Sequence, residues 1–297
     1  MLRLTTEQVQ FFKDQGYLTL EALAEPEEVS EMRAIFEKLF QAKAGENEGA
    51  YGEMIRTSHE EHEPNSPQLL NPVNYAPQLH KMKCFENAQD VARQLLGNEA
   101  RFFFDNSILK RAKTGEGTPW HQDAAFRDPR FEYKEVSFWV PLQDVDAESS
   151  CLRFIPGSHK ENILEHRSAN DDVTAQALQC TDSFDQSAAV ACSLAAGGCT
   201  IHDPGTLHCS GPNLSDVPRL AYIMVFRILP KPAKQERVYP WLEHMQNPVQ
   251  VTKRRWMMRG GLFITLWRKL RRGELLSWSW AVYWSKRSIR ILRYRRY

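Results

Sequence analysis

The sequence has no long hydrophobic run: no window of eighteen consecutive apolar residues occurs in its 297 residues. A chain without such a window is not expected to cross a membrane as a helix. Its beginning, MLRLTTEQVQFF, also lacks the apolar stretch of a secretory signal peptide. None of the six cysteines stands in CxxC spacing, and a disulfide framework is not expected in a chain of this size without a secretion signal. We therefore expect reduced thiols in a cytoplasmic protein.

Net charge is almost absent, at +1, but this total conceals a strong asymmetry. Residues 253–297 hold fourteen Lys and Arg against one acidic residue, Glu274, whereas residues 1–252 hold 24 basic and 36 acidic residues. Five of the eight tryptophans also fall between 253 and 297. This change in composition predicts two parts: a domain at 1–235 and a basic, Trp-rich extension at 236–297.

The basic extension has the pattern of an amphipathic helix. One helical face is apolar, with basic residues opposite or beside it, and consists of Leu262, Phe263, Leu266, Trp267 and Leu270. Such a helix could lie on an anionic membrane surface, or it could pack as a lid on the acidic domain. No nucleic acid partner is expected, because no recognised binding module accompanies the charge.

The N-terminal part reads as helical. Thr6 begins a short helical pattern that Gly16 ends, and Pro26 stands in the first turn of a second one. Residues 44–80 are rich in Gly, Glu, Asn, His and Pro, which predicts a long loop. A further helix is expected at about 82–96.

From about residue 99 the pattern changes to short runs rich in aromatic and β-branched residues. The runs are Arg101–Leu109, Val136–Leu142, Cys151–Ile155, Cys199–His202 and Leu220–Ile228. Gly, Pro, Asp and Ser separate them, which favours an all-β sandwich or barrel over alternating βα units. The domain is therefore expected to consist of a helical layer at 1–98 and a β core at 99–235.

Two segments combine residue types that bind metals. In TPWHQD, His121 and Asp123 lie two apart, so that on an extended strand both side chains leave the same face. In TLHCSGPN, His208 could complete a set of two imidazoles and one carboxylate, which leaves positions of an octahedral iron open. Arg219 lies eleven residues after His208 and could bind the far carboxylate of a dicarboxylic acid.

Each of these residues alone is a weak signal, because a His-x-Asp pair arises often by chance. Structural roles are favoured for His159, which follows a Pro-Gly turn, and for His202, which is expected to support the site rather than bind a metal. Cys209 is expected to be a buried small side chain rather than a fourth ligand. A structural role is also favoured, over a substrate-facing one in a loop at the barrel mouth, for His59, His62 and His80.

The segments around these residues add information through their order. They are WHQD (120–123), VSFWVPLQD (136–144), CLRFIPGSH (151–159), GGCTIHD (197–203) and LHCSGPNLS (207–215), the last leading to Arg219. In order and spacing, over about residues 1–230, they resemble the phytanoyl-CoA dioxygenase family of iron(II)/2-oxoglutarate oxygenases. The resemblance implies a double-stranded β-helix, a cupin-like jelly roll with helices packed outside, which agrees with the all-β pattern.

The resemblance also implies roles for single residues. His121, Asp123 and His208 match the ligands of Fe(II), and Arg219 matches the arginine that pairs with 2-oxoglutarate. Positions that line the cosubstrate pocket are matched by Gln122, Trp139 and Ser210. A polar residue that touches 2-oxoglutarate corresponds to Lys110, with Lys113 as the alternative. Related halogenases have a small residue at the position of Asp123, so the carboxylate implies oxygenation.

These expectations predict an iron(II)- and 2-oxoglutarate-dependent dioxygenase. It would use O2 to hydroxylate an unactivated C–H bond of a small organic or lipid-like molecule, releasing succinate and CO2. The alternative is a jelly-roll metal- or ligand-binding protein without turnover. Arg219 speaks against that alternative, because a simple binding module has no need of a group that holds a dicarboxylate.

Overall fold

The computed structural model describes residues 2–54, 65–114, 117–169, 177–235 and 237–244. The chain divides into two units, Met1–Asn247 and Pro248–Tyr297, and all described residues belong to the first. The expected amphipathic helix of the extension, as well as His59 and His62, lie outside the described residues. Among those that are described, no helix is long and apolar enough to span a membrane.

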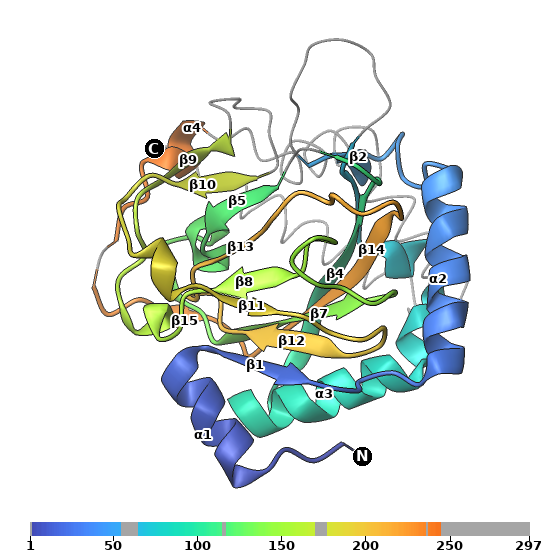
Figure 1. Ribbon diagram of the computed structural model, residues 1–297. Helices are drawn as coiled ribbons and strands as arrows, with labels where there is room; N and C mark the ends of the chain where they lie inside the picture. Colours follow the sequence, from blue (N-terminus) through green and yellow to red (C-terminus); the bar gives the residue numbers. More distant parts are fainter. Residues whose placement is uncertain (1, 55–64, 115–116, 170–176, 236, 245–297) are drawn as a thin grey trace, which may run out of the picture. The chain divides into compact units, whose positions relative to one another are not determined.

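Two antiparallel sheets form the centre of the first unit (Figure 1). The larger sheet has the order β1-β12-β7-β14-β4-β3-β2 and the smaller one the order β11-β8-β13-β5. The larger sheet consists of β1 (Tyr17–Leu20), β2 (Tyr51–Glu53), β3 (Pro67–Leu70), β4 (Arg101–Lys110), β7 (Glu135–Pro141), β12 (Cys199–His202) and β14 (Arg219–Arg227). The smaller sheet consists of β5 (Thr118–His121), β8 (Leu152–Phe154), β11 (Val190–Cys192) and β13 (His208–Ser210). Two short pairs are added by β9 (His166–Ser168) with β10 (Leu178–Cys180), and by β6 (Phe131–Glu132) with β15 (Lys231–Pro232).

The strands of the two sheets pair in a nested order. β4 pairs with β14, β5 with β13, β7 with β12 and β8 with β11, and every pair is antiparallel. The first half of the β core therefore pairs, strand by strand, with the second half in reverse. This is the winding of a jelly roll, the architecture of cupin-like proteins. The prediction of a mainly β fold is confirmed for the described part of the chain.

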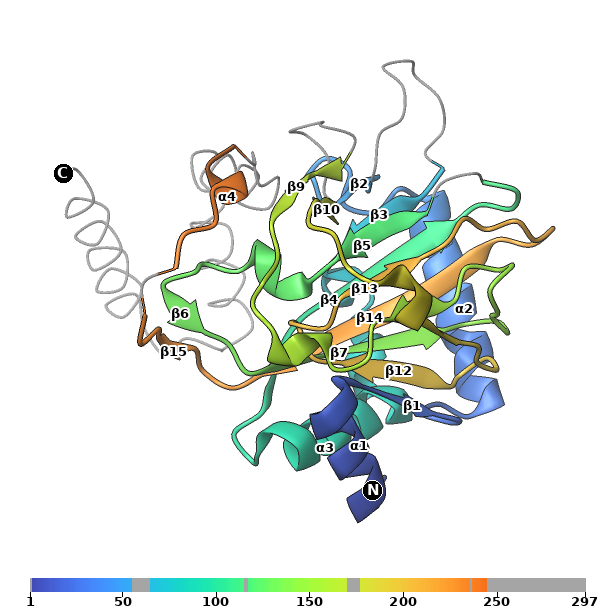
Figure 2. The same ribbon diagram turned by 60° about the vertical axis from the view of Figure 1, so that its left-hand side comes forward.

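Three helices precede the β core: α1 (Thr6–Gln15), α2 (Pro26–Gln41) and α3 (Lys83–Leu96). α2 and α3 share a hydrophobic core with the larger sheet (Figures 1 and 2). In this core, Phe36 of α2 and Phe85 of α3 lie with Tyr222 and Phe226 of β14. The even-numbered residues of β14 therefore face the helices, which leaves its odd-numbered residues for the opposite face.

The opposite face of the larger sheet packs against the smaller sheet. Trp139 of β7 and Ile223 of β14 share a second core with Leu152 and Phe154 of β8. Because both of its faces are covered, β14 is buried along its length except at its last residue. This burial explains why the strand reads as a nearly continuous apolar run.

The expected β runs coincide with β4, β7, β8, β12 and β14, and every end agrees to within one residue. The prediction of a long loop at 44–80 is wrong, because this stretch contains β2 and β3 at the edge of the larger sheet and two short 3-10 helices, η1 (Pro72–Asn74) and η2 (Pro77–Lys81). Backbone hydrogen bonds to β4 hold β3 in the sheet, so the strand forms without a strong apolar alternation of its own. The remaining short elements are η3 (Asp123–Phe126), η4 (Ser158–Lys160), η6 (Gln186–Ala188) and α4 (Trp241–His244).

Gly16 follows α1 and forms hydrogen bonds with the segment that precedes β13. It has a left-handed conformation with φ of +79°, and its carbonyl oxygen accepts hydrogen bonds from the Thr206 hydroxyl at 2.7 Å and from the Asp203 N–H at 2.9 Å. A Cβ atom at Gly16 would collide with the His159 ring and would lie 2.5 Å from Thr206 Oγ1. Only glycine therefore fits this position without displacing its neighbours.

The substitution Gly16→Ala is expected to lower the free energy of unfolding by about 2–4 kcal/mol, because backbone strain and overpacking act together. Urea denaturation measures the change. Gly157→Ala is the matched control: Gly157 has nearly the same backbone conformation, with φ of +78°, but an added Cβ would meet only the Asp14 carbonyl oxygen, at an ordinary contact distance of 3.8 Å. The control isolates the backbone strain, about 1–2 kcal/mol. Equal losses at the two positions would contradict the role of packing at Gly16.

A carboxyl group is buried under the helices. Asp105 of β4 accepts a hydrogen bond from the Tyr222 hydroxyl at 2.8 Å, while its Oδ1 has no hydrogen-bond partner among the described residues. Burial raises the pKa of Asp105 to about 6, although the hydrogen bond from Tyr222 works in the opposite direction. The folded protein therefore retains a proton here that an unfolded chain releases near pH 4.

Asp105 is thus expected to stabilise the fold fully below about pH 4, and this contribution is lost as the pH rises through about 6. Asp105→Asn removes the titration, so the unfolding free energy of the wild type minus that of the variant should fall by on the order of 2–3 kcal/mol between pH 4 and 8. Urea unfolding of both proteins at several pH values tests this expectation. A difference that stays constant with pH would refute it.

Candidate metal and cosubstrate site

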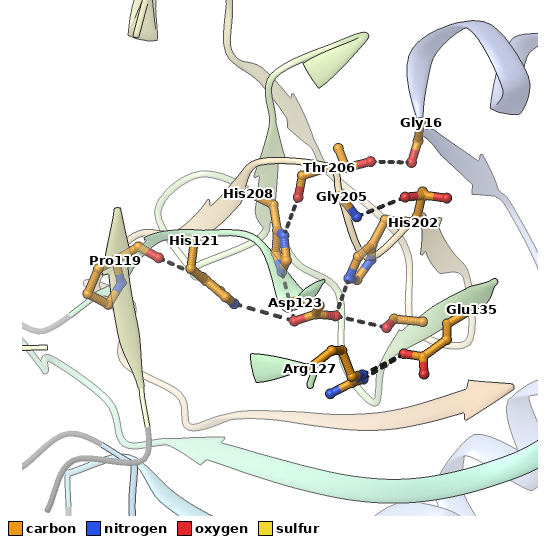
Figure 3. A network of polar contacts seen from close by, with 12 residues as sticks. Gly16, Pro119, His121, Asp123, Arg127, Glu135, His202, Gly205, Thr206 and His208 are labelled. Carbon is orange, nitrogen blue, oxygen red and sulfur yellow. Dashed lines mark hydrogen bonds and ion pairs between the residues drawn. The ribbon is translucent and has the colours of Figure 1, made fainter. Parts of the chain in front are cut away.

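Three potential metal ligands meet at one end of the smaller sheet. His121 is the last residue of β5 and lies opposite His208, the first residue of β13. Asp123 does not continue the strand as predicted; it opens the 3-10 turn η3. The strand ends because the backbone of this turn is bonded elsewhere, for example from the Ala124 N–H to the Pro204 carbonyl at 2.8 Å. The carboxylate nevertheless turns toward both imidazoles (Figure 3).

The three side chains can offer one donor atom each to a single ion. All the ligand atoms lie within 4.8 Å of one another. Asp123 Oδ1 is 3.7 Å from His121 Nε2 and 4.0 Å from His208 Nε2. Two nitrogens and one carboxylate oxygen grouped on one side of a common point suit a facial iron(II) site.

Hydrogen bonds orient both imidazoles for metal binding. Nδ1 of His121 lies 2.8 Å from the Pro119 carbonyl oxygen, and Nδ1 of His208 lies 2.9 Å from the Thr206 carbonyl oxygen. A carbonyl only accepts, so each Nδ1 carries the proton and each Nε2 keeps a free lone pair. Burial lowers the pKa of both imidazoles, that of His208 strongly. Both rings are therefore neutral and ready to act as ligands.

The second carboxylate oxygen of Asp123 is held by the larger sheet. Oδ2 accepts a hydrogen bond from the Ser137 hydroxyl at 2.9 Å and lies 3.3 Å from Nε2 of His202 (Figure 3). Burial alone would raise the pKa of Asp123, but the hydrogen bond from His202 and the neighbouring imidazoles hold it well below its usual range. Asp123 is therefore ionised, with Oδ1 directed to the ligand group.

Two basic side chains lie side by side at the other end of the larger sheet. Arg219 begins β14 and stands directly opposite Lys110, the last residue of β4. Arg219 is only 2% exposed, and its Nε and Nη1 have no hydrogen-bond partner among the described residues, while Nη2 donates to Ser150 Oγ at 3.3 Å. Burial lowers the pKa of Arg219 to about 9. A buried guanidinium with unused N–H groups fits an anionic ligand.

Lys110 and Lys113, the two alternatives from the sequence, have different surroundings. Lys110 is fully buried, and its Nζ donates to Ser210 Oγ at 2.7 Å and to the Gly211 carbonyl at 2.8 Å. Lys113 has a largely exposed side chain that forms an ion pair with Asp216 at 2.5 Å. Lys110 therefore lies beside Arg219, whereas the Lys113 side chain points to an exposed partner, and this geometry favours Lys110 over Lys113.

The other predicted pocket residues divide into two groups. Trp139 and Ser210 lie at the basic end: the Arg219 guanidinium is 5.3 Å from the centre of the Trp139 ring, and Ser210 accepts its hydrogen bond from Lys110. The Gln122 side chain instead bonds to the backbone, donating to the Gly205 carbonyl at 2.7 Å and accepting from the Leu164 N–H at 2.9 Å. Gln122 thus fixes the turn between two metal ligands.

Several residues of the site have no signal in the sequence. Ser150 has a positive φ of 72° and bonds to both basic side chains. Asn106 of β4 shares the inner face with Lys110, and its buried Oδ1 has no hydrogen-bond partner among the described residues. His166 accepts the Gln122 N–H at 3.1 Å, and burial lowers its pKa to about 4. Ser137 alone could have been found, because it lies two residues before Trp139 on the same strand face.

The residues expected to be structural agree with that interpretation where they are described. His159 lies 3.1 Å from the Lys13 carbonyl and ties α1 to η4. His80 stacks on Phe85 in the core beneath the helices. Cys209 is buried, which raises the pKa of its thiol to about 12, and all six cysteines are free.

Comparisons with known proteins agree with this geometry. The family model of phytanoyl-CoA dioxygenase matches residues 12–221. A probable alpha-ketoglutarate-dependent hypophosphite dioxygenase from Stutzerimonas stutzeri is 26% identical over 220 residues, 72% of this chain and 75% of that protein. An ectoine dioxygenase from Bordetella bronchiseptica is 25% identical over 245 residues, 75% of each chain.

Among solved structures, EvdO2 from Micromonospora carbonacea var. aurantiaca complexed with 2-oxoglutarate is similar, with a TM-score of 0.70 and 31% sequence identity. The match covers 81% of this chain and 97% of that one. The fold, the ligand group and these similarities define an iron(II)- and 2-oxoglutarate-dependent oxygenase. Within that class, the chain belongs to the phytanoyl-CoA dioxygenase family.

Proposed function

We propose that this oxygenase hydroxylates an unactivated C–H bond, with iron(II) held by His121, Asp123 and His208 and with the far carboxylate of 2-oxoglutarate held by Arg219. The observation that carries the proposal is the pairing of this ligand group with a buried guanidinium whose Nε and Nη1 have no hydrogen-bond partner in the described part of the chain. Lys110, Trp139 and Ser210 complete the proposed cosubstrate surroundings, and Gln122 supports them by fixing the turn between two metal ligands. A binding protein without turnover is the weaker alternative, because it would not require such a buried cation.

The spacing along β7 supports this assignment. Ser137 bonds to Asp123, and Trp139, two residues further on, lies under the Arg219 guanidinium. Two residues of a strand span about 7 Å. A five-carbon dicarboxylate would match this length, so the ligand group and Arg219 would hold its two ends.

Each residue of the site has its own role in the proposed reaction. Bound iron(II) with 2-oxoglutarate and O2 supplies the oxidising chemistry, with succinate and CO2 as the products. His121 and His208 remain neutral because their Nδ1 protons are committed to backbone carbonyls, and Asp123 remains ionised. The second core, in which Trp139 and Ile223 lie, keeps water away from the cosubstrate. The carboxylate of Asp123 fills the third protein position, which leaves no place for a halide and favours hydroxylation.

The substrate is proposed to be a small organic or lipid-like molecule, and the names of the relatives cover a wide chemical range. Anaerobic incubation with iron(II) and 2-oxoglutarate, then addition of O2 with a panel of lipids, amino acids and natural products, tests the function. We expect succinate release that one substrate class stimulates, and a product heavier by one oxygen atom. A chlorinated product, or iron binding with no succinate from any candidate, would contradict hydroxylation.

The architecture proposed for the whole chain is a jelly roll with a helical layer at 1–98 and a basic helical extension at 236–297. The opposite charges of residues 1–252 and 253–297 support a lid that packs on the catalytic domain. Peripheral contact with an anionic membrane is the second candidate, because basic residues beside tryptophans favour such a surface. Sedimentation with anionic vesicles at low and high salt distinguishes them: pelleting that high salt reverses supports membrane contact, and no pelleting at either salt concentration supports the lid.

A further inference from the structure

The short turn η3 carries the ligand Asp123 and begins two residues after the ligand His121, so its position sets the distance between them. Because this turn is not part of a β-sheet, hydrogen bonds with other segments hold it in place. The Ala124 N–H donates to the Pro204 carbonyl at 2.8 Å, and the Gln122 N–H donates to Nε2 of His166 at 3.1 Å. A third bond comes from much later in the chain: Nε1 of Trp241 donates to the Ala125 carbonyl at 2.9 Å.

Trp241 lies in α4 and is buried, with 9% of its surface exposed. Its ring stacks on Tyr239 with 4.8 Å between the ring centres, and it lies 5.4 Å from the ring of His166. Ala125 and Leu178 belong to the same apolar cluster. One indole therefore contacts both the metal-binding turn and the histidine that accepts a hydrogen bond from that turn.

The indole N–H has a specific consequence for the ligands. The Ala125 carbonyl lies two residues after Asp123, within the same 3-10 turn. A bond that holds this carbonyl restricts rotation of the turn, and rotation would move Asp123 Oδ1 away from Nε2 of His121 and His208. Groups that orient metal ligands in this way typically change metal affinity or activity when they are replaced.

We propose that Trp241 is a positioning residue of the iron site: its N–H and ring hold the turn 122–126, so that the first residues of the stretch 236–297 help to position a metal ligand. This inference rests on the proposed function, because it assumes that Asp123 binds iron. Trp241 itself touches neither iron nor cosubstrate. Its effect passes through the Ala125 carbonyl and through His166.

The test compares three full-length proteins: the wild type, Trp241→Phe, which keeps an aromatic ring but lacks the N–H donor, and Tyr239→Phe. The last is the matched control, since it changes the same cluster without altering the bond to the turn. Anaerobic titration of metal-free protein with iron(II) should show about threefold to tenfold weaker binding for Trp241→Phe, the effect of one lost neutral hydrogen bond. Tyr239→Phe should bind like the wild type.

Hydrogen exchange of the metal-free proteins provides a readout that does not depend on iron. Amides of residues 122–126 should exchange about threefold to tenfold faster in Trp241→Phe, while those of β7 and β14 remain unchanged. Wild-type exchange together with wild-type iron affinity in Trp241→Phe would overturn the inference. A global loss of folding would also overturn it, because the indole N–H would then stabilise the whole fold and not the turn in particular. Failure of the wild type itself to bind iron would overturn the proposed function instead.

Discussion

Replacing His208 by alanine is expected to weaken iron(II) binding roughly a hundredfold or more and to abolish succinate formation. His208 supplies one of the three ligand atoms, and its buried ring lies beside His121 with 4.2 Å between the ring centres. The neighbouring His202 is not expected to replace it, because its Nε2 is engaged by Asp123 Oδ2 at 3.3 Å. The loss should therefore exceed that of residues that only orient the ligands, which is about 10- to 100-fold.

Two further histidines provide graded controls in the same anaerobic titration with iron(II). His202→Leu removes a hydrogen bond to Asp123 but no ligand, so about a 10- to 100-fold loss is expected. His159→Ala removes a bond to the Lys13 carbonyl and should leave iron affinity unchanged. Wild-type iron affinity in His208→Ala would refute the ligand assignment. An equal loss in all three variants would indicate general destabilisation.

The sequence predicted the elements that strong local patterns define. Both ends of β12 were predicted correctly. The apolar run of β14 was recognisable because both faces of this strand are buried. The site residues could be named because two short segments combine unusual residue types and resemble a known family. The nested pairing of the strands was accessible only through that resemblance, since local patterns do not specify which strands pair.

The parts that the sequence did not predict depend on tertiary contacts. Asp123 left the expected strand because the backbone of its turn bonds to the Pro204 carbonyl and to His166, which lie far away in the sequence. The sequence did not show which of Lys110 and Lys113 lies beside Arg219, because this depends on which side chain the fold buries. Lys110 is buried at the end of β4, and the Lys113 side chain is exposed. Ser150 carries no motif, and only its position between two buried cations reveals it.

Replacing Arg219 by leucine is expected to weaken the binding free energy of 2-oxoglutarate by about 1.5–3 kcal/mol. The 2-oxoglutarate concentration needed for turnover should therefore rise roughly 10- to 150-fold. The guanidinium is buried, two of its three nitrogens have no partner among the described residues, and it lies over Trp139. Iron affinity measured without cosubstrate should remain close to that of the wild type, because no metal ligand contacts Arg219. Titration of the anaerobic iron(II) protein with 2-oxoglutarate measures the effect directly.

The conservative change Arg219→Lys separates charge from shape in the same titration. An ammonium group keeps the positive charge but cannot form two parallel hydrogen bonds with a carboxylate, so we expect only partial recovery. Lys113→Leu is the surface control and should bind 2-oxoglutarate like the wild type, since its ion pair with Asp216 is exposed. If Arg219→Leu retained wild-type affinity, the neighbouring buried cation Lys110 would have to hold the carboxylate. Lys110→Met should then show the loss expected here for Arg219, which gives each of the two buried cations its own outcome.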